Sequence, residues 1–414
     1  MPSLVEIQGE ARQWKSRAVC DVGRGCRRGT FRSGHRGVPH EGKGRVTMEP
    51  KRTALSVALA AALALGIAGC GATTSGDTAG SSATESPTVT TAASEDIKKD
   101  AAKTSGTMTA EVDLTQYEAG KAVRLWLPVP HDGDYQKITE LAYSADSGTP
   151  LLYTDDMGNQ MLYVEWGADA DPATRKVTMS FHADRTENLR PDLVEDDSDT
   201  TDMSAYLQGS SMVQSDSEQV KNAAAEITKG KETDLEKVRA IYDWVVANMN
   251  RDENTKGCGQ GDVCALLAGS MSGKCTDINS VFVGLCQASG IPAREHFGIR
   301  MNDGDCTTAQ HCWAEFYLKG TGWVAADPAD VLKAVLKNKW EKDSDEARNT
   351  QEYYFGDWDS KRVEISSGRD LTLVPAQDGE PLNDFGYPYA EVDGDPLDFY
   401  DPENFVYTYT FKAD

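Results

Sequence analysis

The chain has 414 residues and a formal net charge of −24 at neutral pH, and its length allows about two or three domains. Positive charge gathers in residues 1–47, which hold ten Lys and Arg against four Asp and Glu, so the remainder is strongly acidic. An acidic body disfavours nucleic acid and anionic membrane surfaces as binding partners. The composition therefore indicates a solvated, acidic surface and no nucleic-acid partner.

An apolar run, residues 53–68, follows Lys51 and Arg52. It is too short and too rich in Ala and Gly to span a membrane comfortably. Small residues lie directly before Cys70, and this pattern resembles the bacterial lipoprotein signal, in which Cys70 would be lipid-modified. The alternative is an ordinary cleaved signal peptide with an incidental cysteine. We expect an exported protein, anchored by lipid to the extracytoplasmic face of the cell membrane.

Composition divides the chain into segments with different expected roles. The expected order is an upstream extension without a folded role (1–47), the signal peptide and its lipid-bearing cysteine (48–70), a flexible tether rich in Ser, Thr and Ala (71–103), a β-sandwich-like domain (104–186), an acidic linker (187–214) and a catalytic domain with a C-terminal extension (215–414).

Short alternating runs between turn clusters, such as 107–112 and 176–181, predict the antiparallel β-sandwich-like domain. Helices follow, one of them opened by Thr233 and Glu236 at capping-box spacing. The aromatic tail ends in a predicted strand, 405–411, and we expect the tail to pack on the catalytic domain. The fold class is therefore α+β, with the sandwich-like domain first.

The most informative stretch surrounds Cys275. A glycine, Gly273, comes shortly before it, and an apolar helix is predicted from Cys275 to Ser289. Gly290 and Pro292 end this helix, because Gly accepts a left-handed cap and Pro cannot continue a helix. A thiol at a helix N-terminus is favoured as the thiolate.

A β-hairpin is predicted downstream, with strands at 311–318 and 323–327. If its loop has three residues, Asp327 lies diagonally across from His311 on the same face. If the loop has two residues, the register shifts by one and Asp330 faces His311 instead. Pro328 ends the strand after Asp327 and mildly favours the first alternative.

These residue types suit acyl transfer through a thiol. Cys275 would attack a carbonyl carbon, His311 would accept the thiol proton and later pass it to the leaving group, and Asp327 would orient the imidazole. The backbone N–H of Cys275 is one expected oxyanion donor. Candidates for a second oxyanion donor are Gln260, Gln310 and Trp244.

Four motifs agree with one known family. They are residues 273–279, 288–294, 311–317 and 322–328. Together, over roughly 215–330, they resemble the bacterial transglutaminase-like superfamily. The resemblance implies a papain-like α+β catalytic domain in which Cys275 is the nucleophile, His311 the general base and acid, and Asp327 the orienting residue. That superfamily includes cross-linking enzymes, peptidases, amidases and inactive members, so it implies a mechanism more firmly than a substrate.

Six cysteines follow the tether: Cys258, Cys264, Cys275, Cys286, Cys306 and Cys312. Disulfides involving Cys258 with Cys264 and Cys306 with Cys312 are one alternative, with the partners left open. Cys286 falls at a core-like helix position and is expected to be inert. A zinc site built from Cys258, Cys264, Cys306 and His311 lacks standard ligand spacing. We expect neither a metal nor a cofactor.

Two functional hypotheses remain. The first is a membrane-anchored cysteine enzyme that acts on peptide or isopeptide amide bonds of a peptide or protein substrate in the cell envelope. It would form a thioester and favour hydrolysis over cross-linking, because water is always present. The alternative is a catalytically silent binding or scaffolding module on the same fold.

Overall fold

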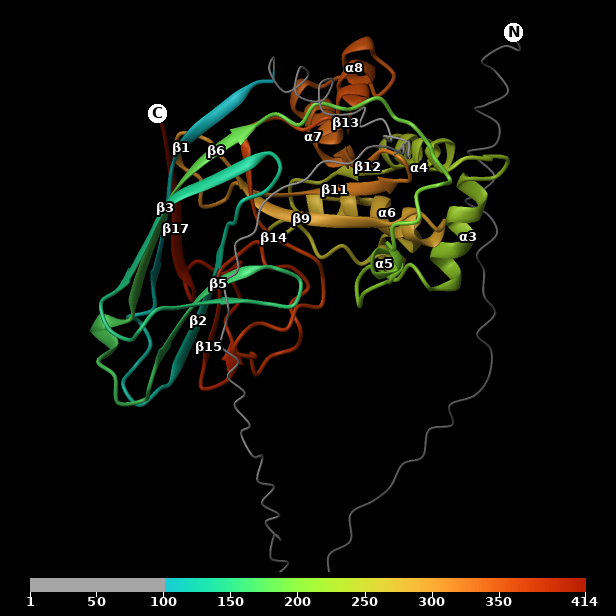
Figure 1. Cartoon of the computed structure of the whole chain (residues 1–414). Coiled ribbons are helices and arrows are strands. Elements are labelled where there is room, and N and C mark those ends of the chain that lie inside the picture. Colours follow the sequence, from blue (N-terminus) through green and yellow to red (C-terminus); the bar gives the residue numbers. More distant parts are fainter. Residues whose placement is uncertain (1–100) are drawn as a thin grey trace, which may run out of the picture. The chain divides into compact units, whose positions relative to one another are not determined.

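The structure, a computed structural model, describes residues 101–414 (Figure 1). The expectations for 1–47, for the signal with Cys70 and for the tether up to residue 100 lie outside the described residues. The fold is mixed α+β with antiparallel sheets, as predicted. Within the described range, no helix is both long and apolar enough to cross a bilayer.

Two five-stranded sheets form a sandwich. The first has the order β10-β17-β1-β6-β3 and the second β16-β15-β2-β5-β4. Their strands are β1 (Lys103–Asp113), β2 (Val123–Val129), β3 (Gln136–Ala145), β4 (Leu151–Thr154), β5 (Gln160–Trp166), β6 (Lys176–Thr186), β10 (Gly304–Asp305), β15 (Tyr389–Val392), β16 (Asp395–Pro396) and β17 (Val406–Ala413). Alternate residues of β1, such as Met108 and Val112, share one core with Leu125 and Val164 from the second sheet.

The C-terminal tail completes both sandwich sheets. β17 pairs with β1, with Phe411 opposite Met108, and β15 pairs with β2. The final strand forms where the sequence predicts it. Tail residues such as Tyr387 and Tyr407 pack against the core around α6, but strands β15 and β17 also complete the sandwich sheets, which the sequence did not predict. The physical reason is that β1 and β2 would otherwise expose unpaired backbone edges. The domain boundaries between 186 and 215 stay a prediction.

A third antiparallel sheet, of order β13-β12-β11-β9-β14, carries the candidate site. Its strands are β9 (Ala293–Arg300), β11 (Gln310–Leu318), β12 (Gly322–Ala326), β13 (Phe355–Gly356) and β14 (Arg362–Ser367). The helices of this region are α3 (Glu218–Ile227), α4 (Asp234–Asn248), α5 (Val263–Ala268), α6 (Cys275–Ala288), α7 (Pro328–Asn338) and α8 (Asp345–Tyr353). The two-residue strands β7 (Asn250–Arg251) and β8 (Ser272–Gly273) pair in parallel, and the 3-10 turns η2 (Pro172–Thr174) and η3 (Ser204–Leu207) complete the elements.

A second hydrophobic core, distinct from that of the sandwich, surrounds helix α6. The helix packs along β9 and β11 (Figure 1). Every residue from Cys275 to Cys286 is buried. The helix ends one residue before the predicted Ser289. Gly290, at φ +81°, donates its N–H to the Gln287 carbonyl at 3.0 Å.

The sandwich and the third sheet share a core. Ile299 of β9 and Val363 of β14 belong to the same buried cluster as the sandwich residues. The side-chain amide of Gln136 donates to the Glu364 carbonyl at 3.0 Å and accepts the Glu364 N–H at 2.9 Å. The third sheet is therefore braced from the sandwich side through β14.

Candidate active site

Cys275 is the first residue of α6 and is only 3% exposed. The Thr276 N–H donates to the Cys258 carbonyl at 2.9 Å, so the preceding loop is fastened to the first helical turn. Unpaired N–H groups at a helix start place positive charge beside the residue located there. This environment favours the thiolate of Cys275, as the sequence predicted for a helix-start cysteine.

Asp277 holds the glycine-rich loop against the helix start. Its carboxylate accepts the N–H groups of Gly261 and Lys274 at 2.9 and 3.0 Å. Gly259 has φ +92°, and a Cβ there would lie 2.0 Å from the Asp277 carboxylate. A Cβ on Gly273 would lie 2.2 Å from the same carboxylate. Only glycine allows the backbone this close to Asp277.

The hairpin brings His311 and Asp327 together. Leu318 pairs with Gly322, so the loop has three residues, and the register places Asp327 across from Trp313. The Nε2 atom of His311 lies 2.8 Å from Asp327 Oδ2, and both side chains are buried. The structure thus has the first of the two registers that the sequence left open.

A fully buried guanidinium, that of Arg362 on the edge strand β14, supports Asp327. Its Nη1 donates to Asp327 Oδ2 at 2.6 Å. Its Nη2 donates to Asp330 at 3.0 Å and to Asp359 at 2.5 Å. Arg362 therefore fixes the position of the carboxylate that orients His311.

Asp330 and Arg300 extend this network. Asp330 Oδ1 lies 3.6 Å from His311 Nε2, and Arg300 forms an ion pair with Asp330. Burial opposes ionisation of Asp330, but Arg300, His311 and Arg362 outweigh it and hold its pKa well below the usual range. Burial and Arg300 likewise act to lower the pKa of His311, but Asp330 and Asp327 raise it above its ordinary value. The imidazolium form is therefore favoured beside Cys275.

Two further thiols flank the nucleophile. Hydrogen bonds from Cys258 and then from Cys312 hold the pKa of Cys275 well below its ordinary value, with His311 adding to the effect against the opposing influence of burial. The hydrogen bond to Cys275 raises the pKa of Cys258, and burial raises that of Cys312. The pKa of Cys275 is thus lowered while those of its two neighbours are raised, which favours Cys275 as the thiolate of this group.

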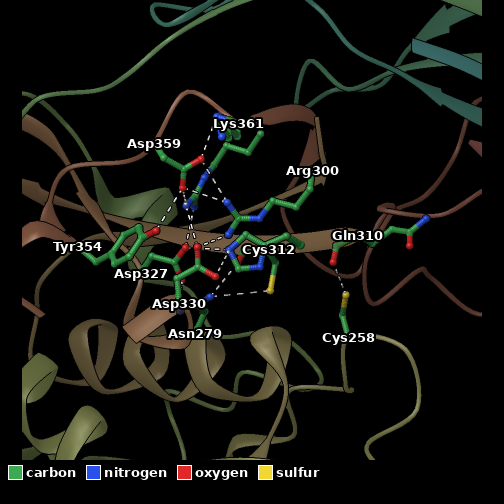
Figure 2. Close-up of polar contacts among 12 residues, drawn as sticks. Cys258, Asn279, Arg300, Gln310, Cys312, Asp327, Asp330, Tyr354, Asp359 and Lys361 are labelled. Atoms are coloured by element: carbon green, nitrogen blue, oxygen red, sulfur yellow. Dashed lines mark hydrogen bonds and ion pairs between the residues drawn. The ribbon is translucent and has the colours of Figure 1, made fainter. Parts of the chain in front are cut away.

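Both neighbouring thiols have fixed positions. The Tyr387 hydroxyl lies 3.0 Å from the Cys258 sulfur, which is itself 3.5 Å from the Gln310 carbonyl. The Thr276 hydroxyl lies 3.3 Å from the Cys312 sulfur. The side chain of Asn279 donates to the Cys312 carbonyl at 2.9 Å (Figure 2). The tail residue Tyr387 therefore helps to position a thiol beside Cys275.

The candidate oxyanion donors differ in placement. Among residues 101–414, the Cys275 N–H donates to no protein acceptor outside the helix, so it is free for a substrate oxygen. The Gln310 side-chain nitrogen is buried without a hydrogen-bond partner, next in sequence to His311. Gln260 is exposed, and Trp244 packs against the second core. Of the three candidates, Gln310 has a buried side-chain donor without a partner, and the choice of the second oxyanion donor stays a prediction.

One group of described side chains, His311, Asp327 and Asp330, has ligand atoms within 4.8 Å of one another and could in geometry hold a metal ion. However, the guanidinium groups of Arg300 and Arg362 already bind these carboxylates. A cation would have to displace them against their positive charge. The donor set fits an ion-pair network and does not fit a metal centre.

The six cysteines of the described residues are all free thiols. Cys306 lies 3.6 Å from the Met108 sulfur inside the sandwich, remote from the other thiols of the proposed pairs and zinc site. The structure therefore assembles neither the two disulfides nor the zinc site considered above. Cys286 is fully buried, and burial raises its pKa well above the ordinary value, which agrees with an inert core thiol.

His296, on β9, is a second buried histidine. It forms ion pairs with Glu315 at 2.9 Å and Glu364 at 2.8 Å, and its ring stacks on Trp313 at 6.1 Å between centroids. Burial would lower the pKa of His296, but Glu364 and Glu315 outweigh it and raise the value to about 9. Because His311 stacks on the same Trp313, this ion-paired imidazolium braces the indole that packs against the candidate base.

Comparisons with known proteins agree with this geometry. The family model described as the transglutaminase-like superfamily matches residues 221–328, a range that contains Cys275, His311 and Asp327. An uncharacterized protein of Haemophilus influenzae is 37% identical over 317 residues, which cover 70% of this chain and 85% of that protein. The chain belongs to the transglutaminase-like superfamily. This membership supports a cysteine-type enzyme at the family level.

Solved structures are similar at lower identity. A candidate cysteine protease of Cytophaga hutchinsonii has a TM-score of 0.46 and 17% identity, and the match covers 75% of this chain and 98% of that one. The periplasmic domain of TgpA from Pseudomonas aeruginosa has a TM-score of 0.30 and 15% identity, with 53% of this chain and 91% of that one covered.

Sequence reasoning missed the supporting shell of the site. Arg300, Arg362 and Asp359 are distant in sequence from His311, and no local pattern marks them as partners of the hairpin. Two signals could have helped. Asp330 was already the alternative partner of His311, and Cys258 lies in the glycine-rich loop that precedes the nucleophile.

Proposed function

We propose that this superfamily member is an active thiol acyl-transfer enzyme that cleaves peptide or isopeptide amide bonds through a thioester on Cys275. The observation that carries the proposal is the arrangement of the charges. The pKa of Cys275 is lowered and that of His311 is raised, and Asp327 Oδ2 lies 2.8 Å from the Nε2 atom of His311. A thiolate and imidazolium held in this way suit nucleophilic attack.

The catalytic roles of Cys275 and His311 follow from which of their atoms already bind other residues. Since Asp327 and Asp330 both face His311 Nε2, the Nδ1 atom is left to exchange a proton with Cys275. The Cys275 sulfur forms a bond to the amide carbon, and the carbonyl electrons move to an oxygen bound by the Cys275 N–H. When the tetrahedral intermediate collapses, the C–N bond breaks and the leaving amine takes the proton from His311.

The thioester is then resolved by a second nucleophile. Water gives a proton to His311, attacks the thioester carbon and releases a carboxylic acid, while the sulfur leaves as the thiolate and restores the starting state. An amine in place of water would give a cross-link. We favour hydrolysis, because a transferase must exclude water that is always present.

We further propose that the enzyme works outside the cytoplasm on a peptide or protein of the cell envelope, anchored by lipid on Cys70. Support comes from the basic residues, the short apolar run and the small residues before Cys70. Metabolic labelling with a fatty-acid analogue is expected to mark the wild-type protein and not Cys70→Ala. Equal labelling of both proteins would contradict the anchor.

The alternative, a silent binding module, makes a different prediction for turnover. We expect Cys275→Ala to abolish turnover of peptide and glutamine–amine substrates, whereas Cys264→Ala, which removes a partly buried thiol elsewhere, retains it. If the wild type turns over no substrate and Cys275 is no more reactive than in the unfolded chain, the binding module is the better account.

A further inference from the structure

Two of the buried thiols, Cys258 and Cys275, lie beside each other at the start of α6. The Cys258 carbonyl accepts the Thr276 N–H at 2.9 Å, so a single hydrogen bond joins the backbone at the two cysteines. The Cys258 thiol is also hydrogen-bonded to Cys275. Disulfides join residues whose Cα atoms lie about 4.4–6.8 Å apart. With these contacts, a small local shift is enough to bring the two sulfurs to bonding distance.

The loop that carries Cys258 is held on the first turn of the helix. Asp277 Oδ1 accepts two backbone N–H groups of this loop, at 3.1 and 2.9 Å. The neighbours of Cys258 in the chain, Gly257 and Gly259, have φ values of +55° and +92°. Glycine accepts a wide range of backbone angles, so the loop stays beside the helix while Cys258 itself has room to rotate toward the nucleophile.

Cys312, the other thiol beside the nucleophile, is less suited to such a link. It lies on β11, an inner strand between β12 and β9. Its sulfur lies 3.3 Å from the Thr276 hydroxyl, and its carbonyl is bound by Asn279 at 2.9 Å. Moving Cys312 would disturb the third sheet, whereas Cys258 lies in a turn outside every strand and helix.

The ionisation of Cys258 depends on the state of Cys275. The hydrogen bond to Cys275 is the largest cause that raises the pKa of Cys258, and burial adds to it, whereas the hydrogen bond with Tyr387 lowers it. The Tyr387 hydroxyl lies 3.0 Å from the Cys258 sulfur. When oxidation removes the negative charge of Cys275, the largest of these causes is lost. The tyrosine hydroxyl then stabilises a Cys258 thiolate.

We propose that Cys258 and Cys275 are a site of reversible oxidation, at which a hydroperoxide oxidises Cys275 and Cys258 closes a disulfide with it. Cys275 is 3% and Cys258 7% exposed, which favours a small hydroperoxide over a bulky disulfide as the oxidant. The disulfide protects the nucleophile from irreversible oxidation. That it also stops turnover until a thiol reduces it rests on the proposed function.

The two steps balance as follows. The Cys275 thiolate attacks the O–O bond of the hydroperoxide and becomes a sulfenic acid, and the leaving alkoxide, or hydroxide from hydrogen peroxide, takes the proton of the Cys258 thiol. The Cys258 thiolate attacks the Cys275 sulfur, the S–S bond forms and the S–O bond breaks. The departing hydroxide takes the proton of the His311 imidazolium and leaves as water. The two cysteines lose two electrons, which reduce the hydroperoxide.

Hydrogen peroxide followed by mass spectrometry under non-reducing conditions tests the site on the whole protein. Trypsin cuts after Lys274, between Cys258 and Cys275, and Cys312 lies on a third peptide. We expect peroxide to link the first two peptides, with fragmentation locating the bond between Cys258 and Cys275. Labelling of Cys275 by iodoacetamide should be lost in parallel and should return after dithiothreitol.

Two serine variants separate the resolving thiol from a general effect of thiol removal. In Cys258→Ser the sulfenic acid has no thiol to meet, so Cys275 should advance to the sulfinic acid and its labelling should not return after dithiothreitol. The matched control is Cys264→Ser, which removes a partly buried thiol of the neighbouring helix α5. It should form and lose the disulfide as the wild type does.

The outcomes separate this site from the proposed function. If peroxide leaves Cys275 reduced, links it to Cys312, or blocks it irreversibly in the wild type as in Cys258→Ser, the oxidation site is wrong, while turnover by the reduced enzyme still supports the proposed function. If the disulfide forms but the reduced enzyme turns over no substrate, the oxidation site stands and the proposed function fails.

Discussion

Replacing Arg362 by Met is expected to cost about 3–5 kcal/mol in the free energy of unfolding. The guanidinium is fully buried and binds Asp327, Asp330 and Asp359 at 2.6, 3.0 and 2.5 Å. Met fills a similar volume but leaves these carboxylates with fewer partners. Asp330 and Asp359 still form ion pairs with Arg300 in the variant. The expected loss of stability is therefore that of breaking one buried ion pair, and not three.

Urea unfolding followed by tryptophan fluorescence measures this cost. The matched control is Arg348→Met, because Arg348 is 57% exposed and pairs with Asp345 at 2.8 Å on the surface of α8. An exposed pair of this kind contributes at most about 1 kcal/mol. If Arg362→Met loses no more stability than Arg348→Met, the buried network does not support the site as described.

Three further predictions concern the thiol group, the second histidine and the helix-start loop. Cys258→Ala should raise the pKa of Cys275, since the bond from Cys258 is the largest influence lowering it; an unchanged pH profile of alkylation would refute this. Because the pKa of His296 is raised to about 9, its stabilisation is full below pH 6.5 and is lost as the pH rises through 9. The free energy of unfolding should therefore fall by about 3 kcal/mol over that range, with a much smaller fall in a His296→Gln variant; equal slopes would contradict the ion pairs. Gly259→Ala should be less stable than Gly158→Ala by about 2 kcal/mol in urea unfolding. Both glycines have positive φ, but only the first would place its Cβ against a carboxylate, so equal losses would count against the loop geometry.

The parts of the site that are local in sequence could be predicted. The glycines around Cys275 and the apolar residues after it determine where α6 begins and ends, and the structure has Cys275 as its first residue. The hairpin that carries His311 and Asp327 could be predicted from two strands of alternating residues joined by a short turn. Its register depends on one residue of loop length, which is why Asp330 remained an alternative until the pairing of Leu318 with Gly322 was known.

Long-range pairing could not be predicted in this way. The alternation of β17 indicates a strand, but nothing in it specifies β1 as its neighbour, and any free sheet edge offers the same backbone groups. The residues that bind Asp327 could not be predicted from local sequence for the same reason. Arg362 follows it by 35 residues, on a strand whose position depends on the whole third sheet. A charged residue in such a strand looks like an exposed one until the fold buries it.

The most direct test of the central claim is the pH dependence of Cys275 alkylation by iodoacetamide, with the labelled cysteine located by mass spectrometry. The account predicts that Cys275 is labelled before every other cysteine of the native protein. It also predicts that the rate rises with a midpoint well below the ordinary thiol pKa, and that Asp327→Asn, which weakens the hold on His311, moves this midpoint upward. Labelling of Cys275 no faster than in the unfolded chain, with an ordinary midpoint in both proteins, would contradict it.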